Sequence, residues 1–441
     1  MLQRYFGNNK TILSVVTSFF MILAGLSACA GQATTPTFTN PNPIVIGASL
    51  SLTGNKNFDF SGDGPAMRQG YQLWADMVNN NGGLLGRPVK LIILDDNSDP
   101  NLVVKNYETL IKQDHVDLLF GPFSTLLTKA ALDVPGISKY AFIEGAGGAY
   151  SVFQKAQQKG LNNLFDVSLP ITNNLTTFVY YLLSLPAADR PTTAAYLTSD
   201  DPFTVPQVQL AETLLEQAGI KTVYTNAENS YINVNKNVPY PEGGNVKVAT
   251  ADAQQMIKQN PQVVILGSLL PDIQIVVPLF KQYHFNPKAL IATAGPDLGQ
   301  QFLDAIKGVK YAEGVFVPNG WYPQANTYQN AEMVSAYTGQ YKVQAGQING
   351  DVAEAFSVGQ VLQQAASKIN SIDNAALIKE LQSSGDVFNT VQGTAQFDVR
   401  DGGQNTQAIS YLFQWQGTQF IPVYPYSVAA ENPTYPKPAT Y

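Results

Sequence analysis

Residues 44–54 have the sequence IVIGASLSLTG, in which an unbroken apolar run at 44–48 leads into a polar loop. A short apolar run of this kind is typical of a strand buried on both faces of a parallel sheet. Apolar residues then recur at helical spacing over 65–79, and a second apolar run at 89–94 ends in Asp95-Asp96. Strand, helix and strand in this order predict a βαβ unit.

The same alternation continues through most of the chain. A helix is expected before each of the next two strands, and a second series of helices and strands begins after Leu169-Pro170. The expected strands are 44–48, 89–94, 116–120, 141–143, 193–197, 222–224, 263–267 and 408–415, and further helix–strand units are expected from Ile273 through Val317. The predicted fold is therefore α/β, with two Rossmann-like halves that each place a parallel sheet between two layers of helices.

Three segments depart from this rhythm. A long helix is expected at 350–368, and the polar stretch 226–245, with its prolines and glycines, is expected to be an extended surface loop. The proline-rich end, 432–441, is expected to be a frayed tail.

The composition limits the classes of partner. Only 13% of the 441 residues are charged, and the net charge is −7, which argues against nucleic acid or an anionic membrane surface as a partner. The two histidines, His115 and His284, have no partner at metal-ligand spacing, and the chain has no G-x-S-x-G, H-E-x-x-H or Walker motif. We expect no metal, no cofactor and no enzymatic activity.

The N-terminus carries targeting signals. An apolar run at 11–25 follows Arg4 and Lys10, and it is shorter than the roughly 20 residues that span a bilayer, so 1–28 is predicted to be a signal peptide. The sequence LSAC at 26–29 resembles the bacterial lipobox, which implies cleavage before Cys29 and acylation of Cys29. The alternative is an ordinary cleavage site beside a bystander cysteine. Residues 29–43 contain little to bury and are expected to form a flexible stalk. The protein is thus expected outside the cytoplasm, anchored by lipid to the membrane.

Four segments together resemble the leucine-binding-protein family. They are 46–54, NGGLLGRPV at 81–89, Asp95-Asp96 and GPFST at 121–125, and weaker similarity extends to about Trp415. The family comprises type I periplasmic binding proteins, the extracytoplasmic subunits of ABC importers for branched-chain and other amino acids or amides. The weaker segments are 267–272, 295–297, 313–315 and 393–398.

The resemblance implies two lobes joined by three crossings, near Leu169-Pro170, near 318–320 and near Gly393. Lobe 1 would comprise 44–169 and 319–393, and lobe 2 would comprise 170–318 and 394–431. A ligand in the cleft would bridge the lobes, and the closed monomer would dock on permease subunits. The alternatives are a sensor lipoprotein of the same fold that serves a membrane receptor, and a hydrolase on a similar scaffold.

The resemblance also implies ligand contacts. Thr125, with Ser124, would hold the ligand carboxylate, although either hydroxyl could instead only cap its helix. Backbone groups of Ala146, Gly147 and Gly148 would also contact the ligand, but Gly148 lacks the hydroxyl that relatives usually have there.

Acidic and apolar residues would complete this site. Asp297 would pair with a ligand ammonium group, or else be a solvated loop residue, and Asp351 would contact ligand or cap its helix. Phe60, with Phe58 as an alternative, and Phe203 would cover the ligand, although aromatic residues at these positions could also be core. Leu269, with Leu270, stands where relatives often have tyrosine, which predicts a more apolar pocket.

Overall fold

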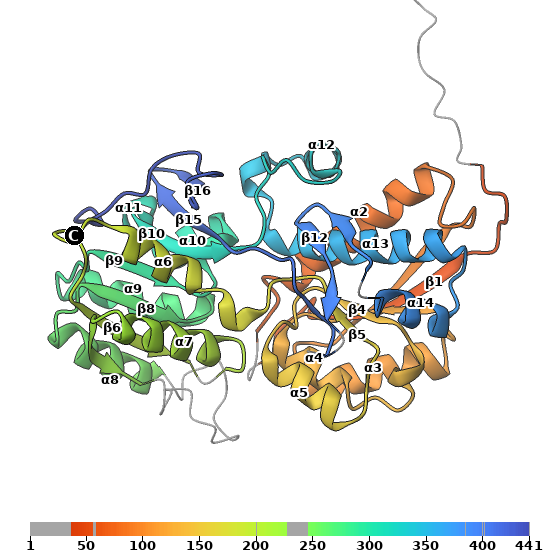
Figure 1. Cartoon of the computed structure of the whole chain (residues 1–441), viewed down its shortest axis with the longest axis horizontal. Coiled ribbons are helices and arrows are strands. Elements are labelled where there is room, and N and C mark those ends of the chain that lie inside the picture. The colour runs from red at the N-terminus through yellow and green to blue at the C-terminus, as the bar shows by residue number, and fades with distance from the viewer. Residues whose placement is uncertain are drawn as a thin grey trace, which may run out of the picture. The chain divides into compact units, whose positions relative to one another are not determined.

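The computed structural model describes residues 37–55, 59–199, 201–226, 246–383, 385–398, 400 and 402–440. The signal peptide, Cys29, most of the expected stalk, Phe58 and the loop 227–245 lie outside the described residues. The strands fall into two separate groups in Figure 1, one for each of the two large sheets.

The first sheet has five parallel strands in the order β2-β1-β3-β4-β5. This arrangement confirms the predicted parallel sheet. The strands are β1 (Ile44–Leu50), β2 (Val89–Asp95), β3 (Leu118–Phe120), β4 (Phe142–Glu144) and β5 (Leu164–Asp166).

Helices cover both faces of this sheet, because alternate residues of a strand point to opposite faces. Ile44, Ile46, Ala48 and Leu50 belong to one buried cluster, whereas Val45 packs against the other. The first cluster lies under α2 (Gly64–Asn80), α12 (Asn330–Tyr341), α13 (Gly350–Ile369) and α14 (Asn374–Leu381). The second lies under α3 (Pro100–Lys112), α4 (Thr125–Ala131) and α5 (Tyr150–Gln158).

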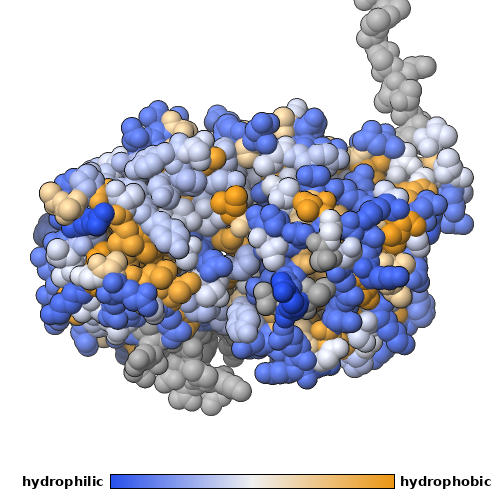
Figure 2. All heavy atoms as spheres, in the orientation of Figure 1, coloured by the Kyte–Doolittle hydropathy of each residue, from blue (hydrophilic) through white to orange (hydrophobic). Residues whose placement is uncertain are grey.

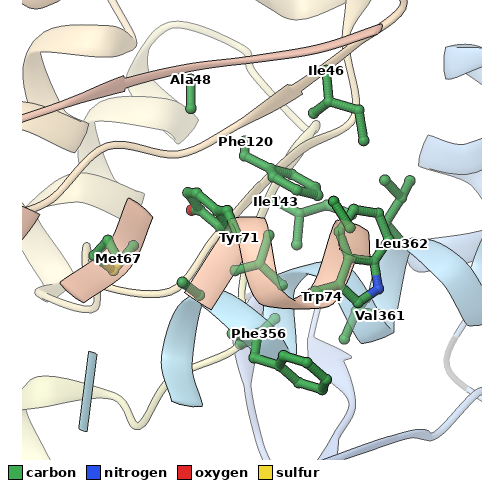
Figure 3. Packing of buried hydrophobic residues seen from close by; sticks show 14 of the residues in the cluster. Ile46, Ala48, Met67, Tyr71, Trp74, Phe120, Ile143, Phe356, Val361 and Leu362 are labelled. Atoms are coloured by element: carbon green, nitrogen blue, oxygen red, sulfur yellow. The ribbon is translucent and has the colours of Figure 1, made fainter. Parts of the chain in front are cut away.

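The α2–α13 pair forms the centre of the first cluster (Figure 3). Trp74 of α2 is 1% exposed, packs edge-on to Phe120 at 5.6 Å, and donates a hydrogen bond to Gln363 of α13 (3.2 Å). A Cβ on Gly359 of α13 would lie 2.2 Å from the Trp74 ring, so only glycine lets the two helices approach this closely. The expected late helix is confirmed, and it belongs to the first lobe.

The second sheet has seven strands in the order β16-β15-β10-β9-β8-β6-β7. Five of them are parallel, and β15 and β16 add an antiparallel edge that the sequence pattern only half predicted. The strands are β6 (Thr193–Thr198), β7 (Lys221–Thr225), β8 (Val263–Gly267), β9 (Ala289–Ala292), β10 (Val315–Asn319), β15 (Tyr411–Gln416) and β16 (Gln419–Tyr424).

Helices cover both faces of this sheet too. Val264 and Leu266 of β8 face one buried cluster, and Val263 and Ile265 face the other. The helices are α6 (Thr176–Ser184), α7 (Thr204–Gln217), α8 (Val246–Lys258), α9 (Leu270–Gln282), α10 (Gln300–Ala305) and α11 (Val309–Ala312). Both lobes are therefore three-layered.

The second segment of lobe 1 extends further along the chain than the resemblance implied. Hairpins β11–β12 (Phe388–Thr390, Gly393–Ala395) and β13–β14 (Phe397–Asp398, Gln404–Asn405) follow α14. Phe397 is part of the first lobe's core, and Asn405 donates a hydrogen bond to the Val167 carbonyl (2.8 Å). We therefore place the third crossing after Asn405 rather than near Gly393.

The C-terminal segment is not frayed. Lys437 is 3% exposed, its backbone N–H donates to the Lys288 carbonyl (2.7 Å), and its own carbonyl accepts from Asn286 (3.0 Å). Proline composition alone misled the prediction, because the segment gains its hydrogen bonds from lobe 2 rather than from a regular element.

The surface in Figure 2 is mostly hydrophilic, with hydrophobic residues in small groups. Within the described part of the chain, no helix combines the length and the hydropathy needed to span a membrane.

Candidate functional site

A cavity of about 680 Å³ lies where the carboxyl ends of strands from both sheets meet. Ligands of open α/β sheets bind at this position. The loops after β1, β3, β4 and β5 contribute to its wall from lobe 1, and those after β6, β8, β9 and β10 contribute from lobe 2. Eight of the ten ligand contacts expected from the sequence line it: Ser124, Thr125, Ala146, Phe60, Phe203, Leu269, Asp297 and Asp351.

The hydroxyls of Ser124 and Thr125 belong to the wall of this cavity, and they have no hydrogen-bond partner among the described residues. Ser124 is the N-cap residue of α4, yet its side chain makes no capping hydrogen bond. Thr125 is 1% exposed, and neither Ser124 Oγ nor Thr125 Oγ1 has a hydrogen-bond partner among the described residues. Both hydroxyls are therefore available to donate to, or accept from, a ligand in this cavity.

The glycine-rich loop after β4 only partly fits its expected role. Ala146 and Gly145 line the cavity, but Gly147 and Gly148 do not. The backbone N–H groups of Ala146 and Gly147 donate to Glu144 (2.9 and 2.5 Å), so they are occupied. A Cβ on Gly148 would lie 2.8 Å from the Leu169 carbonyl oxygen, which explains why this chain has no hydroxyl residue there.

Acidic groups from both lobes converge on the cavity. Asp351 is the second residue of α13, and the cap is instead Asn349, whose side chain accepts from the Asp351 N–H (2.9 Å). Asp297 accepts from the Gly295 N–H (2.7 Å) and is half-buried, so it is not a solvated loop residue. Burial raises the pKa of Asp297 to about 6.

Two further acids, Asp63 and Glu354, line the same wall. Burial, followed by the charge of Asp297, raises the pKa of Asp63. Burial also raises the pKa values of Asp351 and Glu354 well above their usual range, and neighbouring acids raise them further. The sequence offered signals for both: Asp63 directly precedes a helix, and Glu354 follows Asp351 at i+3 on the same helical face.

Residues 43–419 match the sequence profile of the family described as periplasmic binding protein. The chain belongs to this family. Proteins of this description bind solutes, so the prediction of a binding protein rather than an enzyme is confirmed.

Solved structures show the same fold as this binding protein. A putative branched-chain amino acid ABC transporter protein from Silicibacter pomeroyi is 17% identical, with a TM-score of 0.70, and the match covers 90% of this chain and 99% of the other. LivJ from Streptococcus pneumoniae, in complex with isoleucine, is 14% identical with a TM-score of 0.68 (86% and 98% covered). A solute-binding protein from R. palustris, in complex with benzoate, is 14% identical with a TM-score of 0.67 (86% and 95% covered).

The apolar lining of this binding protein serves the core as well as the cavity. Phe60 is buried and packs edge-on against Phe123 at 5.8 Å, and both rings line the cavity. Leu269 contacts a buried cluster in each lobe. Phe203 lines the cavity just before α7. Phe60 is therefore part of the core and part of the cavity wall at the same time.

The described residues contain no group of three or more histidine, cysteine, aspartate or glutamate side chains that could hold a metal ion. His115 and His284 are absent from the lining of this cavity.

Proposed function

We propose that this protein is an extracytoplasmic substrate-binding lipoprotein of an ABC importer, and that it captures an amino acid or a related small carboxylate or amide. The observation that carries the proposal is one cavity with unpaired hydroxyls on lobe 1 and a carboxylate, Asp297, on lobe 2. Its volume of about 680 Å³ lies within the range of about 300–1,000 Å³ that is usual for small-molecule sites. Isoleucine and benzoate, which occupy two of the related structures, both carry a carboxylate.

In this proposal the ligand carboxylate accepts hydrogen bonds from Ser124 and Thr125, and a ligand ammonium group donates to Asp297. Because the two hydroxyls belong to lobe 1 and Asp297 belongs to lobe 2, each end of the ligand is held by a different lobe. Both contacts involve a charged group, and such hydrogen bonds are stronger than those between neutral groups. Ala146, Phe60, Phe203, Leu269 and Asp351 would form the remaining wall.

Closure follows from this division of contacts. A ligand that touches both lobes gains its full binding energy only when the lobes approach, so it shifts the population toward the closed form. The closed form would then dock on the permease subunits. The lipid on Cys29 and the stalk 29–43 would keep this monomeric protein close to them.

A thermal-shift screen of the purified full chain tests the proposal. A ligand that binds only the native state raises the melting temperature, so at least one amino acid, amide or aromatic acid should do so. Uptake of that ligand should fall in cells that lack the gene. Binding with unchanged uptake would indicate a sensor instead, and conversion of the ligand to a product would indicate a hydrolase.

A further inference from the structure

We infer that the ligand of this cleft is a small organic cation, an ammonium or guanidinium compound that carries more positive groups than carboxylates. The inference rests on the proposed function, since it names the ligand class of the same site. A basic amino acid and a diamine share this chemistry, and the experiment below separates them.

The first observation is the charge of the cavity wall. Six carboxyl side chains line it, and none of the described lining residues is lysine, arginine or histidine. Asp59 and Asp201 organise their own loops, where they accept hydrogen bonds from the Ser61 and Phe203 N–H groups (3.1 and 2.7 Å). The other four acids are Asp63, Asp297, Asp351 and Glu354.

The second observation is that this wall contains polar atoms without partners. Asp351 Oδ2 is buried, and the one group that reaches it among the described residues is the carboxyl of Asp63, which can donate only when it is protonated. Its close neighbour is another acid, Asp63. Burial is the largest cause that raises the pKa of Asp351, and the charge of Asp63 is the second. An unpaired buried carboxylate is costly, so this pair needs either a proton or a cation.

Neither carboxylate is needed to start its helix. Asp63 precedes α2 without making a side-chain capping hydrogen bond, and Asn349 caps α13 in place of Asp351. Local helix chemistry therefore does not explain the two acids. Only a bound positive group would offset the burial and the mutual repulsion that disfavour ionisation of these two acids.

Thr125 provides an independent sign of a ligand in the same cavity. Its side chain is almost completely buried on the cavity wall, and Oγ1 has no partner in the described part of the chain. The hydroxyl can accept from a ligand ammonium group or donate to a ligand carboxylate. Thus the site offers neutral hydroxyl contacts beside a cluster of acids.

The acids also oppose each other across the cleft. Asp297 belongs to lobe 2, and its charge acts on Asp63, Asp351 and Glu354 of lobe 1. Like charges that approach each other disfavour closure, whereas a cation between them replaces this repulsion with attraction. A neutral amino acid brings only one positive group and places its carboxylate in the same negative field. A dicarboxylate or an aromatic acid brings no positive group, so we expect it to bind more weakly still.

Isothermal titration calorimetry on the purified full chain at pH 7.5 tests the inference. The probes are L-arginine and L-lysine, the diamine putrescine and its guanidinium counterpart agmatine, and the comparison ligands L-leucine, L-glutamate and benzoate. We expect a cationic probe to bind at least about tenfold more tightly than leucine, since hydrogen bonds to charged groups exceed neutral ones by that order. Arginine and lysine should bind more tightly than putrescine and agmatine if Thr125 holds a ligand carboxylate. Putrescine and agmatine should bind more tightly if it does not.

Variants locate the contact. Asp63→Asn and Asp351→Asn should each weaken cation binding by about tenfold or more. The matched control is Asp76→Asn, which removes the same charge from α2 at a position outside the cavity, where Asp76 accepts from Gln72. The control should leave the affinity unchanged.

Three results would overturn the inference, and they separate it from the proposed function. Tight leucine binding without preference for cations refutes the cationic ligand and leaves the proposed function standing. Cation binding that survives both variants within twofold refutes the role of Asp63 and Asp351. Failure of every probe and of the wider thermal-shift screen refutes the proposed function as well.

Discussion

Replacement of Thr125 by valine should weaken ligand binding while it stabilises the empty protein. Valine keeps the shape and the β-branching of threonine and removes only the hydroxyl. Thr125 Oγ1 is buried and has no partner among the described residues, so the native protein bears the cost of an unmade hydrogen bond. That cost is about 1–3 kcal/mol for a buried polar group.

The stability of the empty protein and its affinity for the ligand should therefore change in opposite directions. The free energy of unfolding of Thr125→Val, measured by urea denaturation without ligand, should rise by up to about 1 kcal/mol. The dissociation constant of the ligand, measured by calorimetry, should rise by about tenfold or more, because a hydrogen bond to a charged group is lost.

Thr128→Val is the matched control. Thr128 lies one turn later in α4, its hydroxyl is also buried without a described partner, and it does not line the cavity. This variant should show the gain in stability and no change in affinity. The reasoning fails if Thr125→Val destabilises the empty protein by more than about 1 kcal/mol and leaves binding intact, since the hydroxyl would then be structural.

Three further predictions concern packing, pH and anchoring. Gly148→Thr should lower the free energy of unfolding by about 1–3 kcal/mol in urea denaturation, because its Cβ would crowd the Leu169 carbonyl; an unchanged value would show that this loop can yield. Folding raises the pKa of Asp297 from 3.8 to about 6, and it raises the pKa of Asp63 as well. The folded state therefore binds protons more tightly than the unfolded state. The ligand-free protein should lose stability as the pH rises from about 4 to 6. Melting temperatures measured across this pH range show whether stability falls as the pH rises. A saturating cationic ligand should make stability less dependent on pH. Stability that increases with pH would contradict the burial of these acids. Cys29→Ser should move the protein from the membrane fraction to the soluble fraction in cell fractionation, and retention in the membrane would exclude the lipid anchor.

The sequence predicted most of the framework because apolar runs and helical spacing are local signals. Strands β1, β2 and β8 and helix α13 appear close to where their patterns place them. The antiparallel strand β16 was missed, since a short segment with internal proline gives no clear alternation. The third crossing was misplaced because the hairpins after α14 gain their stability from lobe 1, which local sequence does not reveal.

The candidate site was predictable only in part. Ser124, Thr125 and Asp297 come together as the resemblance implied, because each follows a strand at the same end of its sheet. Asp63 and Glu354 were missed, since an acid near a helix start is usually a surface residue. Only the tertiary fold shows that these two carboxyl groups turn inward.

The late position of α13 in the chain has a consequence for folding during export. This helix covers α2 and supplies the partner surface for Trp74, although almost 300 residues separate Trp74 from Gln363, to which it donates. A chain that has emerged only as far as β10 still exposes the apolar face of α2, so lobe 1 cannot complete its core. In the extracytoplasmic protein that we propose, a core that waits for α13 would delay the folding of lobe 1 until most of the chain has been made.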